Sequence, residues 1–366
     1  MLSLLGKIKV DAEALRQAEE RLRAVWNYEE PDSIPLIIDA PIPKEWPVFA
    51  YSEEFKDMRK MLINQLASVY VHSKIKDDAM LTIRANYGVG IIPSSFGCEI
   101  VLKGDNMPWP QPILRDAEEA YALRLPDLRT SGLCGRVLET MEFYEESLRV
   151  AGLDEYVHVY LADTQGPLDL AFILRGVDFY KDLFTKRKAV HRLLDVVTEA
   201  YIEFSKLMKD VIGEPYDEGY HMMIRMAEGG VRICEDVAVN LSPEAYLEFS
   251  KPYNERAFEP FRGGYIHFCG KGHHILRHVL ETKWLRGLNL GNPEFYDVSH
   301  LMELLSEHKI CLIGWPLRYD REKGFTQSVR EFLDGLGIRT GIIVRAQASG
   351  INEARRIISK WRSLFR

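Results

Sequence analysis

The stretch "GGYIHFCGKGHHILRH", residues 263–278, decides the fold because it joins a short apolar run to an amphipathic pattern through a glycine-rich turn. The run at 264–269 predicts a β-strand, and the pattern over 271–282 predicts an α-helix. His267 and Cys269 stand two residues apart at the end of this strand, so their side chains are expected on the same face. Gly270 and Gly272 allow the tight turn into the helix.

The same unit of strand followed by helix recurs along most of the chain. Strands are predicted at 34–39, 81–86, 156–162, 231–236, 264–269, 285–290, 310–315 and 340–345. Helices are predicted at 185–212, 243–259, 271–282, 297–307, 324–335 and 350–364. Alternation of this kind implies parallel pairing, and eight such strands predict an α/β fold, a closed (β/α)8 TIM barrel.

The barrel is expected to occupy 34–366 as one domain. Residues 1–33 are expected to form an N-terminal helical extension, with an amphipathic helix over 11–27. The segment 88–135 has no clear periodicity, and we expect it to hold a hairpin and loops over one end of the barrel.

The composition of the chain excludes several classes of protein. Of the 366 residues, 46% are hydrophobic and 28% are charged, as in a globular protein. The net charge of −7 argues against a nucleic-acid partner, and no apolar window is long enough to predict a membrane span. Five scattered cysteines indicate reduced thiols and a cytoplasmic protein.

Polar and aromatic side chains follow nearly every predicted strand, whereas the strands themselves are apolar. Barrel enzymes place their chemistry at the carboxyl ends of the strands, so this rim is the predicted active site. We expect Asp236, His267 and Cys269 to be catalytic. The residues expected to bind substrate are Tyr87, Asp163, Gln165, Asn289 and Trp315.

His267 and Cys269 carry ligand types that zinc accepts, which makes them a two-ligand start to a zinc site. The alternative is a lumen histidine and a buried thiol that are satisfied by their neighbours. Zinc needs a third protein ligand, and Cys311 lies too far below the rim to supply it. Cys234 or Asp236 could reach, although Asp236 could instead form a salt bridge.

Three further stretches point to a family. "DTQGPLDLAFILRG" (163–176), "LSPEAYLEFSKPYNE" (241–255) and "HFCG" (267–270) together resemble the uroporphyrinogen decarboxylase superfamily, which includes the zinc-dependent methylcobalamin:coenzyme M methyltransferases. The resemblance is strong over roughly 160–270, looser over 285–360 and faint before 150. It implies a (β/α)8 barrel, in agreement with the strand count.

Two branches of the superfamily compete. The decarboxylase branch has an N-terminal arginine-rich motif that binds the carboxylates of the substrate, and this chain has nothing similar. The methyltransferase branch holds zinc with H-x-C, matched by His267 and Cys269, and with a later cysteine. Here Ala346-Gln347-Ala348 stands where that cysteine is expected, so the third zinc ligand would have to come from Cys234, Glu235 or Asp236.

The resemblance therefore implies a corrinoid-linked methyltransferase with Zn2+ on His267 and Cys269. A small molecule would give or accept the methyl group, and the corrinoid would be a co-substrate carried by a partner protein that docks over the rim. A homodimer is a further possibility. One alternative is a metal-free decarboxylase or lyase acting on a carboxylate, in which Asp236 stabilises a developing cation and His267 moves the proton. Another is a non-catalytic barrel that binds a tetrapyrrole or corrinoid.

Overall fold

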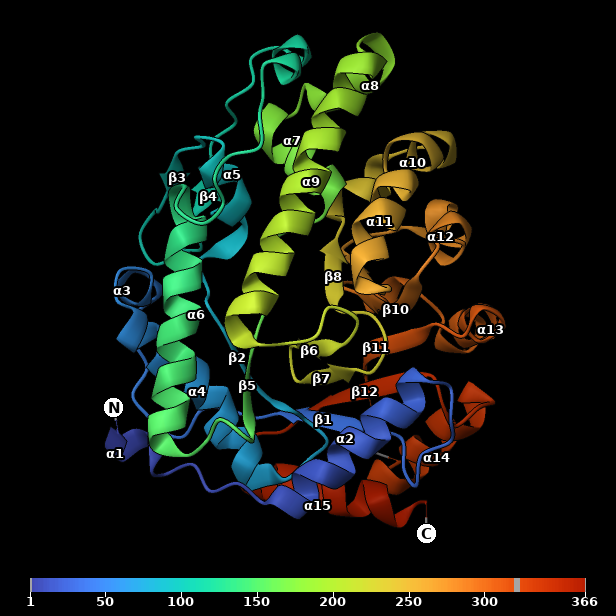
Figure 1. Cartoon of the computed structure of the whole chain (residues 1–366). Helices are drawn as coiled ribbons and strands as arrows, with labels where there is room; N and C mark the ends of the chain where they lie inside the picture. Colours follow the sequence, from blue (N-terminus) through green and yellow to red (C-terminus); the bar gives the residue numbers. More distant parts are fainter. Residues whose placement is uncertain (1, 319–322, 366) are drawn as a thin grey trace.

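The computed structural model describes residues 2–318 and 323–365, and it consists of parallel strands surrounded by helices (Figure 1). All eight predicted strands are present, with bounds within two residues of the prediction. They are β1 (Leu36–Asp39), β2 (Leu81–Arg84), β5 (Val157–Tyr160), β8 (Val231–Cys234), β9 (Gly264–Phe268), β10 (Leu285–Leu290), β11 (Cys311–Pro316) and β12 (Ile342–Gln347).

Six of these strands form one hydrogen-bonded sheet in the order β1-β12-β11-β10-β9-β8, and β2 pairs with β5. Every pairing among the eight is parallel. The order follows the chain around a circle, so the predicted (β/α)8 TIM barrel is confirmed. Two seams remain between the six-stranded sheet and the β2–β5 pair.

The two seams are bridged by contacts other than strand ladders. Between β5 and β8, the N–H of Gly166 donates to the carbonyl of Cys234 at 2.8 Å. A Cβ on Gly166 would lie 2.5 Å from that carbonyl oxygen, so only glycine fits. Between β1 and β2, the side chains of Asp77 and Asp78 accept hydrogen bonds from the N–H groups of Ile38 and Leu36, at 2.6 and 2.9 Å.

The predicted helices are also present, with one interruption. The helix predicted at 243–259 is two helices, because Pro252 has no N–H with which to continue the first one. The helices of the fold are α2 (Ala12–Trp26), α9 (Arg187–Ile212), α10 (Pro243–Phe249), α11 (Lys251–Phe258), α12 (His273–Leu280), α13 (Val298–His308), α14 (Phe325–Leu336) and α15 (Ile351–Ser363), with α1 (Leu2–Leu5), α3 (Tyr51–Glu54), α4 (Met58–Ile75), α5 (Ile91–Ser95), α6 (Gly132–Ala151), α7 (Pro167–Arg175) and α8 (Phe179–Thr185). In the described ranges no helix combines the length and the apolar character needed to cross a bilayer.

Two hairpins interrupt the alternation of strand and helix. The first, β3 (Ile100–Val101) with β4 (Trp109–Pro110), lies in the segment 88–135, as predicted. The second, β6 (Gly219–His221) with β7 (Ile224–Met226), was not predicted.

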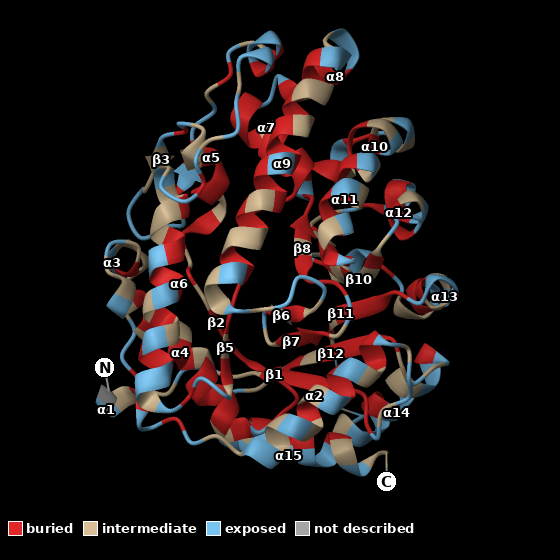
Figure 2. Cartoon of the chain, viewed as in Figure 1, coloured by how far each residue is buried: buried red, intermediate tan, exposed pale blue. Residues whose placement is uncertain are grey.

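An apolar layer closes the amino-terminal end of the barrel. Alternate strand residues such as Leu36 and Ile38 pack outward against the helices, whereas Ile37 and Ile313 point inward. Trp26 of the helix α2 and residues of the β6–β7 hairpin pack on these inward side chains. The strands and the inner faces of the helices are accordingly buried in Figure 2. The N-terminal helix therefore plugs one end of the lumen, and the carboxyl ends of the strands form the other.

Candidate functional site

Above the apolar plug, the lumen is lined by charged and aromatic side chains. Arg84 and Tyr160 come from β2 and β5, which are paired at these residues, and Arg232 comes from β8, where it is paired with Tyr265 of β9. Asp163 lies between the two arginines, at 3.7 Å from Nη1 of Arg84 and 3.2 Å from Nη1 of Arg232. Burial would raise the pKa of Asp163, but Arg232 and Arg84 hold it well below its ordinary value. Asp163 is therefore a permanent anion between two cations.

The next layer toward the rim contains the residues predicted to be catalytic. His267 Nε2 lies 3.6 Å from Cys269 Sγ and 3.9 Å from Asp236 Oδ1. Cys234 is paired with His267 across β8 and β9, and ligand atoms of Cys234, Asp236 and His267 all lie within 4.8 Å of one another. The structure thus brings together the two predicted ligands and two of the three candidates for a third ligand. The other candidate, Glu235, is fully buried and accepts a hydrogen bond from a serine instead.

Asn289 fixes the orientation and tautomer of His267. The Asn289 side-chain amide donates to the carbonyl of Ile313 at 2.7 Å, so its Oδ1 faces His267 Nδ1 at 2.6 Å. Because that oxygen can only accept, Nδ1 carries the proton and Nε2 keeps its lone pair toward Cys269. Burial, followed by the charge of Arg232, lowers the pKa of His267, which favours this neutral form.

Asp236 is held by two backbone contacts. The buried carboxylate of Asp169 accepts the N–H groups of Asp236 and Val237, each at 3.0 Å, where a 3-10 turn begins. Asp236 in turn accepts the N–H of Cys269 at 2.7 Å, and its side chain is 46% exposed. It forms no salt bridge with Arg232, which binds Asp163 instead.

The thiols at this site are protonated at neutral pH. Burial, followed by the nearby carboxylate of Asp236, raises the pKa of Cys269 to about 11. Burial also raises the pKa of Cys234 well above its ordinary value. Neither thiol is therefore a nucleophile by itself, and a cation placed beside it would be needed to ionise it.

The donor set fits zinc. Ligands at about 2.3 Å (sulfur) and about 2.0 Å (nitrogen) around a tetrahedral zinc lie about 3.5 Å apart, and the observed separation of Cys269 Sγ from His267 Nε2 is 3.6 Å. The free lone pair on His267 Nε2, together with the oxygen of Asp236 and the sulfur of Cys234, completes a set of the kind that zinc binds. In the described part of the chain this is the one group of three such ligand residues.

One of the residues predicted to bind substrate, Asn289, lines the mouth of the lumen. A pocket of about 780 Å3 at the ends of β1, β10, β11 and β12 is bordered by Asn289, Asp39, Arg345 and Gln347, among others. The guanidinium of Arg345 forms two hydrogen bonds with Asp39, at 2.5 and 2.7 Å. Gln165 lies deeper, where its side-chain amide donates to Asp163 at 2.6 Å. The side-chain amides of Asn289 and Gln165 are therefore already bonded to other residues of the chain.

Tyr87 and Trp315 do not lie where the sequence predicted. Tyr87 is fully buried, its hydroxyl is bonded to Thr140 at 2.9 Å, and its ring packs on Phe55. Trp315 should share the inward face of Ile313, but an irregularity at Gly314, with φ of 74°, shifts the register of β11. The extra residue turns Trp315 into the core between strands and helices. Neither aromatic side chain faces the lumen.

Cys311 and the two histidines that follow the turn after β9 lie outside this cluster. Cys311 is buried at the amino-terminal plug, as its depth in the strand predicted. His274 bonds the carbonyl of Leu241, and His273 stacks on Tyr296. These histidines have structural partners on the outer ring of the barrel.

Three residues of the site were not identified from the sequence. Arg84 and Arg232 are charged residues at inward positions of otherwise apolar strands, a signal that the alternation pattern contained. Asp169 lies inside a predicted helix, and nothing in the local sequence indicated that it supports Asp236.

The fold is shared with a solved structure. A methyltransferase from Methanosarcina mazei matches with a TM-score of 0.68 at 20% identity, over 95% of this chain and 99% of that chain. Residues 50–212 match the family model described as uroporphyrinogen decarboxylase (URO-D). Over these residues the match agrees with the predicted resemblance to the uroporphyrinogen decarboxylase superfamily. The curated proteins contain no match.

The extent of the superfamily match differs from the prediction. The family model covers residues 50–150, where the resemblance was expected to be faint, and it ends before the H-x-C motif. The matched segment contains Arg84 and Asp163 but not Arg232, His267 or Cys269. The superfamily match therefore supports the fold and the lower part of the lumen, whereas the cluster around His267 stands on its own geometry.

Proposed function

We propose that this protein is a corrinoid-linked methyltransferase in which His267, Cys269 and a third ligand, Asp236 or Cys234, hold zinc. One observation carries the proposal: ligand atoms of Cys234, Asp236 and His267 lie within 4.8 Å of one another, and Cys269 Sγ lies 3.6 Å from His267 Nε2. This cluster offers the third ligand that the last strand lacks.

Different residues of the chain would orient the zinc ligands and admit the substrate. Asn289 holds His267 in the tautomer that presents Nε2, and Asp169 holds Asp236 against the turn that carries Cys269. Zinc bound there would supply the positive charge that strips the proton from a substrate thiol at neutral pH. The pocket bordered by Arg345 and Gln347 would admit the substrate beside this cluster. A corrinoid protein would dock over the open rim and present the methyl group.

The test combines metal analysis with activity. Elemental analysis of the wild type and of His267→Ala, Cys269→Ser, Asp236→Asn and Cys234→Ser should show near-stoichiometric zinc in the wild type and loss in the first two variants. Whichever of the last two also loses zinc contains the third ligand. Methyl transfer from methylcobalamin to a panel of thiols should follow the zinc content. A zinc-loaded protein that transfers no methyl group to any thiol would refute the proposal.

A second candidate rests on the description of the matched family model. In a metal-free decarboxylase, Asp236 would stabilise a developing cation, and neutral His267, 3.9 Å away, would move the proton. Chelators would then leave activity unchanged, whereas Asp236→Asn would abolish it. Measuring activity before and after chelator treatment separates the two candidates.

A further inference from the structure

The motif at 241–255 directs two buried polar side chains toward the end of β8. Ser250 lies at the break between α10 and α11, and Asn254 lies one turn further along α11, on the same face. Both side chains are fully buried. The amide of Asn254 donates to Ser250 Oγ at 3.2 Å, and the Ser250 hydroxyl donates to Oε1 of Glu235. A buried chain of hydrogen bonds therefore joins the outer helices to the strand.

Glu235 lies between two of the candidate zinc ligands. It follows Cys234 and precedes Asp236, and each of these two residues has a ligand atom within 4.8 Å of one on His267. Because side chains alternate along a strand, Glu235 points away from its two neighbours, toward the helices. Its N–H donates to the carbonyl of His267 at 2.8 Å. The backbone of Glu235 thus contacts the cluster, while its side chain is bound on the other side of the strand.

The carboxyl end of β8 lies at a seam of the barrel. In the described part of the chain, β8 is an end strand of the six-stranded sheet and pairs with β9 only. At its other edge, the seam to β5 is bridged by the hydrogen bond from Gly166 to the carbonyl of Cys234. A strand end held in this way is less constrained than one paired along both edges. The buried contact from the motif at 241–255 adds a further restraint.

The burial of Glu235 is costly for the fold. Its side chain is fully buried, and its partners are neutral, namely the hydroxyl of Ser250 and the nearby amide of Asn254. Among the described residues no cation forms an ion pair with it. A buried carboxylate without a cation costs more free energy than an apolar side chain of similar volume would. Stability alone therefore does not account for this glutamate, whereas functional sites often retain such a cost.

We propose that Glu235 is a positioning residue. Through its hydrogen bonds to the motif at 241–255 it fixes the end of β8, so that the candidate zinc ligands on either side of it face His267. The motif thereby acts on the site without contacting the substrate. That the positioned cluster holds zinc rests on the proposed function, whereas the positioning of its side chains does not.

Cysteine alkylation tests this role in metal-free protein. Cys234 belongs to the cluster, whereas Cys134 and Cys311 are buried elsewhere in the fold. Labelling with iodoacetamide, followed by peptide mass spectrometry, gives a rate for each thiol. In Glu235→Ala the rate at Cys234 should rise by at least about fivefold, because the released strand end opens locally. The rates at Cys134 and Cys311 should stay unchanged.

Conservative and matched variants separate positioning from packing. Glu235→Gln keeps the size of the side chain and the acceptor for the Ser250 hydroxyl, so its rate at Cys234 should stay within about twofold of the wild-type rate. Glu244→Ala removes an exposed glutamate of the same motif and should label as the wild type does. Equal rises at all three buried thiols in Glu235→Ala would make Glu235 a purely structural residue and overturn the proposal. An unchanged rate at Cys234 would overturn it as well.

Circular dichroism shows whether Glu235→Ala folds. If it does not, Ser250→Ala and Asn254→Ala weaken the same hydrogen bonds and keep the carboxylate. Each should raise the rate at Cys234 by about twofold to fivefold. Labelling of Cys234 at the wild-type rate in both variants would refute the positioning role.

Zinc affinity connects this role with the proposed function. Competition with a chromophoric chelator should show an affinity about tenfold to a hundredfold lower in Glu235→Ala than in the wild type, a loss typical of groups that orient metal ligands. Glu235→Gln should retain most of the affinity. Unchanged zinc affinity in Glu235→Ala would overturn the positioning role. Selective labelling of Cys234 in a protein whose wild type binds no zinc would refute only the proposed function.

Discussion

Charged side chains have many partners within the chain at the amino-terminal end of the barrel and few in the lumen near the other end. At the amino-terminal end, Asp78 is fully buried and accepts hydrogen bonds from Arg21, from Arg362 and from the N–H of Leu36, each at 2.9 Å. Lys209, also fully buried, donates to Glu214 and to two backbone carbonyls. In the lumen below the rim, Arg84 and Arg232 share one carboxylate.

This difference separates groups that stabilise the fold from groups that make few contacts within the chain. Polar side chains whose partners are all within the chain hold elements together, and removing one leaves the others buried and unpaired. Polar side chains with few internal partners contribute little to stability, and they are expected at functional sites. Four measurements test this separation.

The largest effect is expected for Asp78→Ala. Loss of this carboxylate leaves Arg21 and Arg362 short of a partner and exposes the edge of β1, so the free energy of unfolding should fall by about 3–5 kcal/mol. Chemical denaturation measures the change. Asp32→Ala removes the other partner of Arg21 at an exposed position, and it should cost less than about 1 kcal/mol. Equal losses in the two variants would contradict the role given to burial.

An intermediate effect is expected for Asn289→Ala, at the opposite end of the barrel. Without the acceptor for Nδ1–H, His267 is free to rotate and to change tautomer, so zinc affinity should fall by about tenfold to a hundredfold. Competition with a chromophoric chelator measures this affinity. Asn289→Asp keeps an acceptor and should retain most of it. Stability against denaturant in the absence of metal should barely change in either variant.

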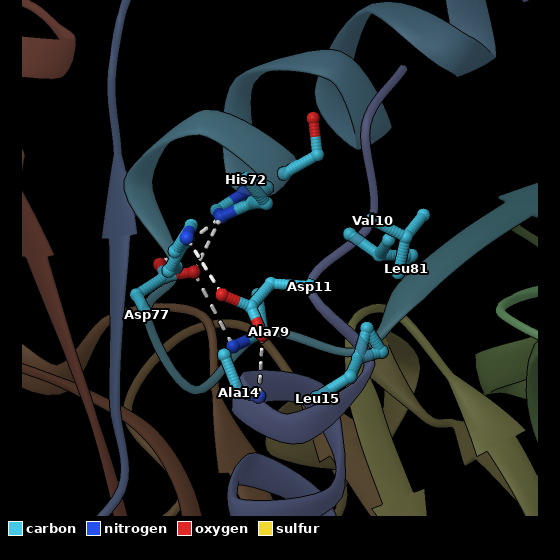
Figure 3. A pocket seen from close by; sticks show the side chains of 10 residues that line it. Val10, Asp11, Ala14, Leu15, His72, Asp77, Ala79 and Leu81 are labelled. Carbon is cyan, nitrogen blue, oxygen red and sulfur yellow. Dashed lines mark hydrogen bonds and ion pairs between the residues drawn. The ribbon is translucent and has the colours of Figure 1, made fainter.

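A pH-dependent effect is expected for His72, which lies beside Asp77 and a cavity of about 20 Å3 (Figure 3). Burial alone would lower the pKa of His72, but Asp77, at 3.0 Å, raises it above the ordinary value. Asp39 acts in the same direction and Arg345 in the opposite one. The ion pair therefore stabilises the fold fully below the ordinary pKa of histidine, and this contribution is lost as the pH rises through the raised value.

Denaturation of the wild type and of His72→Gln between pH 6 and pH 9 measures this contribution. At pH 6 the free energy of unfolding should be about 1–2 kcal/mol higher for the wild type than for His72→Gln. This difference should shrink toward pH 9. A difference in the free energy of unfolding that grows with pH would mean that His72 is neutral in the folded protein.

A small effect on stability is also expected for Arg84→Gln. Because this arginine has few internal partners, its loss should change the free energy of unfolding by no more than about 1 kcal/mol. The same denaturation assay measures it. A loss as large as that of Asp78→Ala would make Arg84 a structural residue and remove the contrast between the two ends.

The strands could be predicted from the sequence because each is a short apolar run between turns, and this local signal survives folding. The pair formed by His267 and Cys269 followed from the same alternation, since both residues precede the turn after β9. The inward positions of Arg84 and Arg232 follow the same alternation. They were missed because site residues were expected only at the carboxyl ends of the strands.

The remaining features depend on contacts between segments distant in the sequence. Trp315 is misplaced by one irregular residue, Gly314, because a single inserted residue reverses the face of every later side chain. Tyr87 follows a strand, yet it packs against Thr140 of α6, which the sequence did not reveal as its neighbour. The use of Asp77 and Asp78 as substitutes for a strand partner has no local signature.

The plug formed by α2 and the β6–β7 hairpin limits how small molecules can reach the lumen. Because apolar side chains fill the amino-terminal end, small molecules reach the lumen residues only through the rim. A macromolecule seated on that rim would block the same opening. If the proposed corrinoid protein docks there, substrate has to enter before it docks, and product can leave only after it dissociates.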